Sequence, residues 1–237
     1  MSGCRVLPLE TVDDDMTDTR ADGDVLVSYL TLRRVVGTLG VALPIVLVLW
    51  GFALCECLGF QPTISDYYAL RTRDAFVGIL STIGWFLFTY RGYDRRDDIA
   101  GNLACLFALG VAFFPNRGTA LERGVHFGSA LALFLVLAYF SLILFTKSAG
   151  NPTPQKLIRN RIYRACGVIM LACIALIGLC YWKLNTAAFF SAKPVFWLES
   201  LALWAFGFSW FVKGEAILKD SEPPARDGDS APALPRS

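Results

Sequence analysis

The sequence predicts an all-α, polytopic membrane protein: a bundle of six transmembrane helices between disordered termini. Hydrophobic residues make up 55% of the 237 residues and charged residues only 18%, with a mean hydropathy of +0.49. A soluble domain carries about 25% charged residues. Apolar runs of about 18 residues recur along the chain, and a run of that length crosses a hydrocarbon layer of about 30 Å. Composition and run length therefore both favour a multi-pass membrane protein.

Six helical spans are expected, each an apolar run between polar connections. Their expected ranges are 35–58, 74–90, 99–114, 125–145, 163–182 and 194–212. The first span follows Arg33-Arg34 and contains Pro44, which predicts a kink that a neighbouring helix must cover. The third is short and rich in glycine and alanine, which permits close helix–helix approach, and Pro115 ends it. The sixth ends at Lys213.

Polar tails are expected on both sides of the membrane domain, which spans residues 32–215. Residues 1–31 are acidic, and residues 216–237 are rich in proline, alanine and charge. Such segments bury too little apolar surface to order themselves, so both are predicted to be disordered and cytoplasmic. No basic region followed by an apolar run opens the chain, so a cleaved signal peptide is not expected.

The charges of the short loops predict the orientation in the membrane. Twelve Lys and Arg residues lie near the span ends on the side of both termini, and six lie on the other side. Because cytoplasmic loops carry an excess of Lys and Arg, the sequence predicts a protein of the cell inner (plasma) membrane with both termini cytoplasmic. The basic loop between the fourth and fifth spans either follows this general bias or binds anionic head groups through Lys156, Arg159, Arg161 and Arg164.

Several classes of function are not expected. The formal charge of +2 is small and no basic patch alternates with aromatic residues, so a nucleic-acid partner is not predicted. No Cys-x-x-Cys occurs among the seven cysteines, which argues against structural zinc, although a Cys57–Cys180 disulfide stays open. There is no phosphate-binding Gly-rich loop and no dinucleotide fingerprint, so no cofactor is predicted.

Polar residues gather at the expected outer ends of the spans and define a candidate site. Glu199 lies about a turn and a half inside the sixth span, where a carboxylate is costly and needs a partner or a proton. His126, the chain's single histidine, opens the fourth span. We interpret these residues as lining one outward-facing pocket, polar at its mouth and aromatic below, that suits an amphiphile. The candidate ligand-binding residues are Ser65, Asp66, Tyr67, Tyr68, Asp74, His126 and Glu199.

Each candidate also has a structural interpretation. Asp74 suits a helix start and Asp66 a turn, His126 suits a satisfied interfacial ring, and Glu199 suits an ion pair with a neighbouring basic residue. A multi-histidine hydrolase is excluded by the single histidine, whereas a zinc site of these four residues stays open. A triad of Ser65, His126 and an aspartate has no Gly-x-Ser-x-Gly elbow to support it. No catalytic residue or metal ligand is assigned.

The chain resembles a family of uncharacterised bacterial multi-pass membrane proteins over residues 32–215. The segments that carry the resemblance are I-S-D-Y-Y (64–68), R-D-A-F-V-G-I-L (73–80), Y-R-G-Y-D (90–94), G-N-L-A-C-L-F-A-L-G-V-A-F-F-P (101–115), H-F (126–127) and F-W-L-E-S-L-A-L-W-A-F-G (196–207). More distantly, Ile64-Ser65-Asp66 and His126 make it similar to the six-helix group of damage-regulated autophagy modulators and GPI-anchor remodelling proteins. The resemblance implies a lipid-linked role for Ser65, Asp66, His126 and Glu199.

Three functions are carried forward from the sequence. The first is an integral membrane protein that binds or senses a lipid or another amphiphilic small molecule through the outer pocket, with membrane lipids as its partners. The second is a membrane-embedded lipid-modifying enzyme. The third is a structural subunit of a membrane complex, which predicts a protein that co-purifies in fixed proportion.

Overall fold

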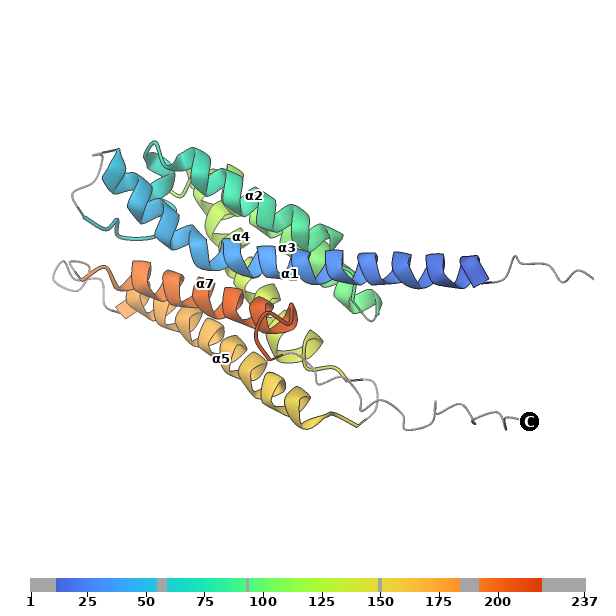
Figure 1. Cartoon of the computed structure of the whole chain (residues 1–237). Coiled ribbons are helices and arrows are strands. Elements are labelled where there is room, and N and C mark those ends of the chain that lie inside the picture. Colours follow the sequence, from blue (N-terminus) through green and yellow to red (C-terminus); the bar gives the residue numbers. More distant parts are fainter. Residues whose placement is uncertain (1–11, 55–58, 93, 149–150, 184–191, 219–237) are drawn as a thin grey trace, which may run out of the picture.

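The computed structural model describes residues 12–54, 59–92, 94–148, 151–183 and 192–218. Within these ranges the protein is helical and contains no strand (Figure 1). The six α-helices are α1 (Val12–Ala53), α2 (Arg73–Thr89), α3 (Arg95–Phe113), α4 (Ala120–Tyr139), α5 (Pro154–Lys183) and α7 (Pro194–Lys213). A 3-10 helix, η1, spans Ser65–Ala69, and a π-helical turn, η2, spans Phe140–Leu144. The predicted all-α class with six helices is confirmed.

The helices form an antiparallel bundle in which neighbours along the chain are neighbours in space (Figure 1). Helix α1 packs on α2, α2 on α3, α3 on α4, α4 on α5 and α5 on α7, and α7 packs back on α1. The short connections after α2, α3 and α4 favour such antiparallel pairs. We call the end at which α2, α4 and α7 begin the His126 end, and the end at which they finish the Lys213 end.

Four helical segments in the described ranges are long and apolar enough to cross a membrane. They are Tyr29–Ala53, Ala120–Leu144, Pro154–Trp182 and Pro194–Lys213. Helix α2 has only 17 residues, and α3 opens with the charged run Arg95–Asp98, so neither belongs to this group. Large apolar side chains such as Leu49, Leu131 and Leu176 are exposed on the spans, as expected where lipid replaces water. Membrane crossing by α2 and α3 remains a prediction.

Two helices begin earlier in the chain than the expected ranges. Residues 12–31, expected in the N-terminal tail, form the first part of α1, and extending an existing helix needs no new nucleation. This part of α1 extends beyond the other helices (Figure 1). Helix α5 begins at Pro154, a residue suited to the first helical turn, so Lys156 and Arg159 lie on a helix and not in a loop. Residues 1–11 and 219–237, and Cys57, lie outside the described ranges.

Helices α1 and α7 approach each other through two glycines. A Cβ atom added at Gly207 would lie 2.6 Å from the backbone oxygen of Gly37. A Cβ atom added at Gly37 would lie 2.8 Å from the backbone oxygen of Gly207. Small residues permit this kind of backbone contact between membrane helices. The contact fixes the position of α7, which carries Glu199.

Gly207→Ala is expected to destabilise the bundle by about 1–3 kcal/mol, because the new methyl group collides with backbone that can move only with the whole of α1. Gly128→Ala is the matched control, since a Cβ atom there meets nothing within 4 Å. The measurement is reversible unfolding in mixed micelles. Equal unfolding free energies for the two variants would contradict the close approach of α1 and α7.

Candidate functional site

The connection between α1 and α2 folds into the His126 end of the bundle. We call residues 59–72 the inserted segment. Its residues 63–68 are each at most 8% exposed. Thr63 Oγ1 accepts a hydrogen bond from the Asp66 N–H at 3.0 Å, and Thr72 Oγ1 donates to the Tyr67 carbonyl at 2.7 Å. These bonds satisfy buried backbone groups and shape η1.

His126 joins the inserted segment to the turn between α3 and α4. Its ring is fully buried at 0% exposure. Nδ1 lies 2.7 Å from the Phe114 carbonyl oxygen, and Nε2 lies 3.0 Å from Ser65 Oγ. A carbonyl oxygen only accepts, so Nδ1 carries the proton, and Nε2 of the neutral ring accepts from the Ser65 hydroxyl. Both ring nitrogens are therefore satisfied within the protein.

Asp66 makes a second attachment to the same turn. Its Oδ1 accepts from Asn116 Nδ2 and from Arg117 Nε, each at 2.8 Å. The carboxylate and Asn116 are buried, whereas the Arg117 side chain is exposed. A buried charge requires such partners, because an isolated one loses its hydration without compensation. Asp66 thus holds the inserted segment against the α3–α4 turn.

Glu199 makes a third attachment, on α7. It lies five residues after Pro194, which is about 7 Å along the helix. Its Oε2 accepts the backbone N–H of Ile64 at 2.5 Å. One turn earlier, the Phe196 N–H donates to the Pro62 carbonyl at 3.1 Å. A backbone N–H of the inserted segment therefore meets the Glu199 carboxyl group, for which the structural interpretation of the sequence offered an ion pair with a basic residue.

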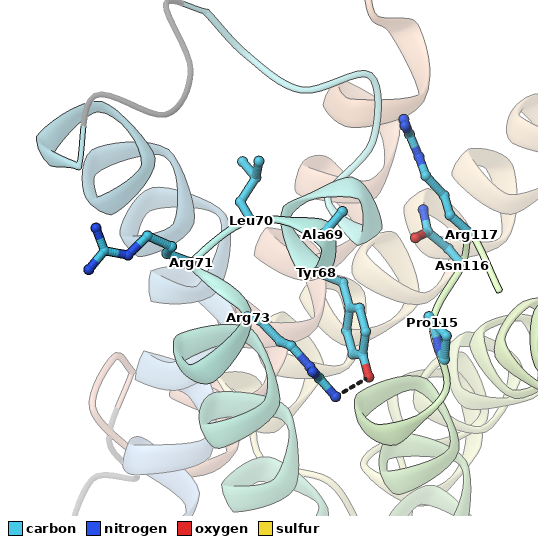
Figure 2. Close-up of a pocket in the computed structure, with 8 residues that line it drawn as sticks. All are labelled: Tyr68, Ala69, Leu70, Arg71, Arg73, Pro115, Asn116 and Arg117. Carbon is cyan, nitrogen blue, oxygen red and sulfur yellow. Dashed lines mark hydrogen bonds between the residues drawn. The ribbon is translucent and has the colours of Figure 1, made fainter.

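A polar cavity of about 770 Å³ lies beside the inserted segment (Figure 2). The Tyr68 hydroxyl accepts from Arg73 Nη2 at 2.9 Å and donates to the Phe113 carbonyl at 3.3 Å. Figure 2 shows Arg73 beside Tyr68, whereas Arg71 extends away from it. We call this space the Arg117 cavity. Its lining residues are Tyr68, Ala69, Leu70, Arg71, Arg73, Pro115, Asn116 and Arg117.

An apolar groove of about 380 Å³ runs between α4 and α5 and reaches α7. Phe127, Leu131 and Tyr181 in its lining are each 49% exposed, so it opens on the side of the bundle. Glu199 is its single charged residue. We call it the Glu199 groove. Its lining residues are Phe127, Ala130, Leu131, Phe134, Ile174, Ile177, Gly178, Tyr181 and Glu199.

Six of the seven predicted site residues meet at the His126 end. Ser65 to Tyr68 belong to the inserted segment, and His126 and Glu199 bind it from α4 and α7. Asp74 lies exposed in the first turn of α2, and none of the described side-chain contacts joins it to the others. Sequence reasoning did not select Asn116 and Arg117. Their place after the third span puts them at the correct end, but no sequence signal pairs them with Asp66.

The geometry does not form the hydrolytic sites considered from the sequence. His126 Nδ1 binds the Phe114 carbonyl, so no aspartate orients the ring as in a Ser-His-Asp triad. The N–H groups of Asp66 and Tyr67 bind the carbonyls of Thr63 and Ile64, so neither serves as an oxyanion donor. Within the described ranges, no three His, Cys, Asp or Glu side chains lie close enough to hold a metal ion. The alternative of a zinc site formed by Asp66, Asp74, His126 and Glu199 is therefore contradicted.

Comparison with known proteins does not extend this description. No match was found among protein-family models, curated proteins or solved structures. The function must therefore be argued from the geometry of the site.

Proposed function

We propose that this chain is an integral membrane protein that binds an amphiphile in the Glu199 groove. The observation that supports this most directly is a lateral apolar groove with one carboxyl group, on helices that are long and apolar enough to cross a membrane. Its volume of about 380 Å³ lies within the usual range for ligand sites, about 300–1,000 Å³. The ligand class is an apolar chain or ring system with a hydroxyl or amine head.

The two parts of such a ligand match the two parts of the groove. The apolar body packs against Phe127, Leu131 and Ile177, which are otherwise exposed to lipid or only partly covered. The head group hydrogen-bonds to Glu199, which is partly exposed to the groove. A polar partner at that depth is favourable because hydrocarbon offers no hydrogen bonds.

The inserted segment connects the Glu199 groove to the polar surface at the His126 end, which would allow the protein to sense the ligand. Ile64 binds Glu199, Ser65 binds His126, and Asp66 binds Arg117, so three consecutive residues connect the groove to the Arg117 cavity. A head group that competes with the Ile64 N–H for the Glu199 carboxyl weakens one of these attachments. The occupied and empty protein then differ at the polar surface of the His126 end.

Location and orientation belong to the same proposal. The excess of Lys and Arg favours a cytoplasmic Lys213 end in a cell inner membrane. The His126 end then faces outward, and the Glu199 groove opens toward the outer half of the membrane. Helices α2 and α3 complete the six spans by packing against α1 and α4. Membrane lipids are the surrounding partners.

Filling the groove tests the proposal. Gly178→Leu places a side chain in the groove at a position where a Cβ atom meets nothing within 4 Å. We expect the amphiphile retained by the purified protein to fall about tenfold or more, because the new side chain occupies the binding volume. The measurement is quantitative lipid mass spectrometry after purification in a mild detergent.

Two matched controls accompany this experiment. Gly128→Leu adds the same side chain to open space on α4, outside the groove lining. Glu199→Gln replaces the carboxyl group with an amide that keeps an acceptor for Ile64, whereas Asp74→Asn makes the same change outside the site. Wild type and the control variants Gly128→Leu and Asp74→Asn should retain the amphiphile class. The proposal fails if all five proteins carry the same bulk lipid.

A lipid-modifying enzyme is the second candidate, and one observation favours it. Ser65 Oγ lies 3.0 Å from His126 Nε2, the distance of a nucleophile from its general base. Both groups are buried, and neither lines the Arg117 cavity or the Glu199 groove. A fluorophosphonate probe distinguishes the candidates: labelling of wild type but not of Ser65→Ala would favour the enzyme. We expect neither protein to be labelled.

A further inference from the structure

A second polar cavity lies at the Lys213 end, far along the bundle from the Glu199 groove. Its volume is about 310 Å³, and its walls come from α1, the turn after η2, α5 and the end of α7. Five basic side chains and one acidic side chain line it. These charged residues are Arg33, Lys147, Lys156, Arg159, Lys213 and Glu215. We call it the basic cavity.

Two of the basic side chains form ion pairs with carboxylates of the described residues. Lys147 Nζ lies 2.8 Å from Asp97 Oδ2 and 3.0 Å from Asp94 Oδ2. Burial alone would lower the pKa of Lys147, but the hydrogen bonds to Asp97 and Asp94 outweigh it and raise the pKa. Lys147 therefore stays charged. Arg159 pairs with Glu215 at the longer distance of 3.8 Å.

Four of the five basic side chains, Arg33, Lys156, Arg159 and Lys213, are buried or half-buried in the cavity wall. Arg159 and Lys213 are only 7% and 9% exposed, so their side chains are shielded from bulk water. Arg33 Nη1 reaches the Lys213 carbonyl at 3.5 Å, and its buried Nε has no hydrogen-bond partner among the described residues. Lys156 Nζ donates to the Phe145 carbonyl at 2.8 Å. A wall with five basic side chains and one acidic side chain favours binding of an anion.

Hydrogen-bond donors and a helix terminus add to the cavity. Ser148, Thr153 and Tyr163, whose side chains carry hydroxyl groups, are among its lining residues. Thr153 Oγ1 accepts the Lys156 N–H at 3.1 Å, which places the first turn of α5 against the cavity. The positive end of the helix dipole there attracts anions, as at many phosphate sites.

We infer that the basic cavity binds a phosphate-bearing anion. A phosphate group carries up to two negative charges and several acceptor oxygens, which suit a cavity lined by two arginines and three lysines. The cavity lies where the candidate spans Pro154–Trp182 and Pro194–Lys213 have their ends. A lipid phosphate and a small soluble phosphate compound can both reach this depth. The site does not depend on the amphiphile proposed for the Glu199 groove.

The test uses charge-matched variants of the full-length protein. Lys156→Gln and Arg33→Gln each remove one positive charge from the cavity, on different helices. Arg161→Gln removes one from the exposed face of α5, outside the cavity lining. The first probe is sodium pyrophosphate, which is titrated in detergent while thermal unfolding is followed. The second probe is a nanodisc of phosphatidylcholine with or without phosphatidic acid, and the retained lipid is counted by native mass spectrometry.

Each cavity variant is expected to weaken binding about tenfold or more, as the loss of a charge-assisted hydrogen bond does. Arg161→Gln is expected to change it by less than about threefold, because exposed charges are screened. Retained phosphatidic acid that is lost in both cavity variants identifies a lipid phosphate. Pyrophosphate binding without retained phosphatidic acid identifies a soluble one. Binding of neither probe, or an equal loss in Arg161→Gln, would overturn the inference, and Glu199→Gln should bind as wild type does.

Discussion

Replacing His126 with alanine is expected to lower the unfolding free energy by about 3–5 kcal/mol. The variant leaves the Phe114 carbonyl and the Ser65 hydroxyl without their partner at 2.7 Å and 3.0 Å. Each buried unsatisfied group costs about 1–3 kcal/mol, and the missing ring adds a void. The measurement is unfolding in mixed micelles, with the exposed Arg123→Ala on the same helix as the control.

Two conservative variants separate the bonds of His126. In His126→Asn the amide takes the place of Nδ1 and keeps the bond to the Phe114 carbonyl. In His126→Gln the amide takes the place of Nε2 and keeps the bond to Ser65. Each should recover part of the lost stability, and a double-mutant cycle with Ser65→Ala should show a coupling of about 0.5–3 kcal/mol. A wild-type unfolding free energy for His126→Ala would refute the structural role.

The positions of the helices were predictable because the apolar runs and the breaks between them are strong signals. The ends were less predictable. Helix α1 begins in an acidic stretch at Val12, well before its first long apolar run, and α5 begins inside a basic stretch. In both cases the apolar part of the helix is already formed, so each added residue extends the helix without a new nucleation step. Charge in the sequence therefore did not mark the end of a helix.

That the candidate site residues lie at one end of the bundle was also predictable in part. In an antiparallel bundle, the first connection and the starts of the fourth and sixth helices fall at one end, so Ser65, His126 and Glu199 had to be near one another. Their bonds to each other were not predictable, since the Phe114 carbonyl and the Ile64 N–H are backbone groups that leave no mark in the sequence.

The Glu199 groove and the basic cavity could not be predicted from the sequence for a different reason. Phe127, Leu131 and Ile177 look in the sequence like ordinary lipid-facing residues, and only the packing of α4 against α5 turns them into a groove. In the same way, the basic residues near the start of α5 match the common charge bias of cytoplasmic loops. Only the fold shows that Lys156 and Arg159 face a cavity shared with Arg33, whereas Arg161 lies outside its lining.

Trp210→Ala is expected to destabilise the protein by about 3–5 kcal/mol. The side chain is 1% exposed, and its ring lies 5.2–6.0 Å from those of Tyr90, Phe140, Phe145 and Phe206. Removing it leaves a void that neither lipid nor water fills, so the loss is one of packing contacts and occurs in a membrane as in a soluble core. Trp85→Ala, at an exposed position on α2, is the matched control.

The same residue separates packing from hydrogen bonding. The buried Trp210 Nε1 has no hydrogen-bond partner among the described residues, so Trp210→Phe keeps most of the ring contacts and removes an unsatisfied donor. We expect Trp210→Phe to cost less than about 1.5 kcal/mol. Phe145 also lies 5.4 Å from Lys213 Nζ, so Trp210→Ala should weaken pyrophosphate binding to the basic cavity while the Glu199 groove keeps its amphiphile. Equal losses of pyrophosphate binding and of retained amphiphile would mean that the bundle unfolds as one unit. The packing around Trp210 would then not act on the basic cavity alone.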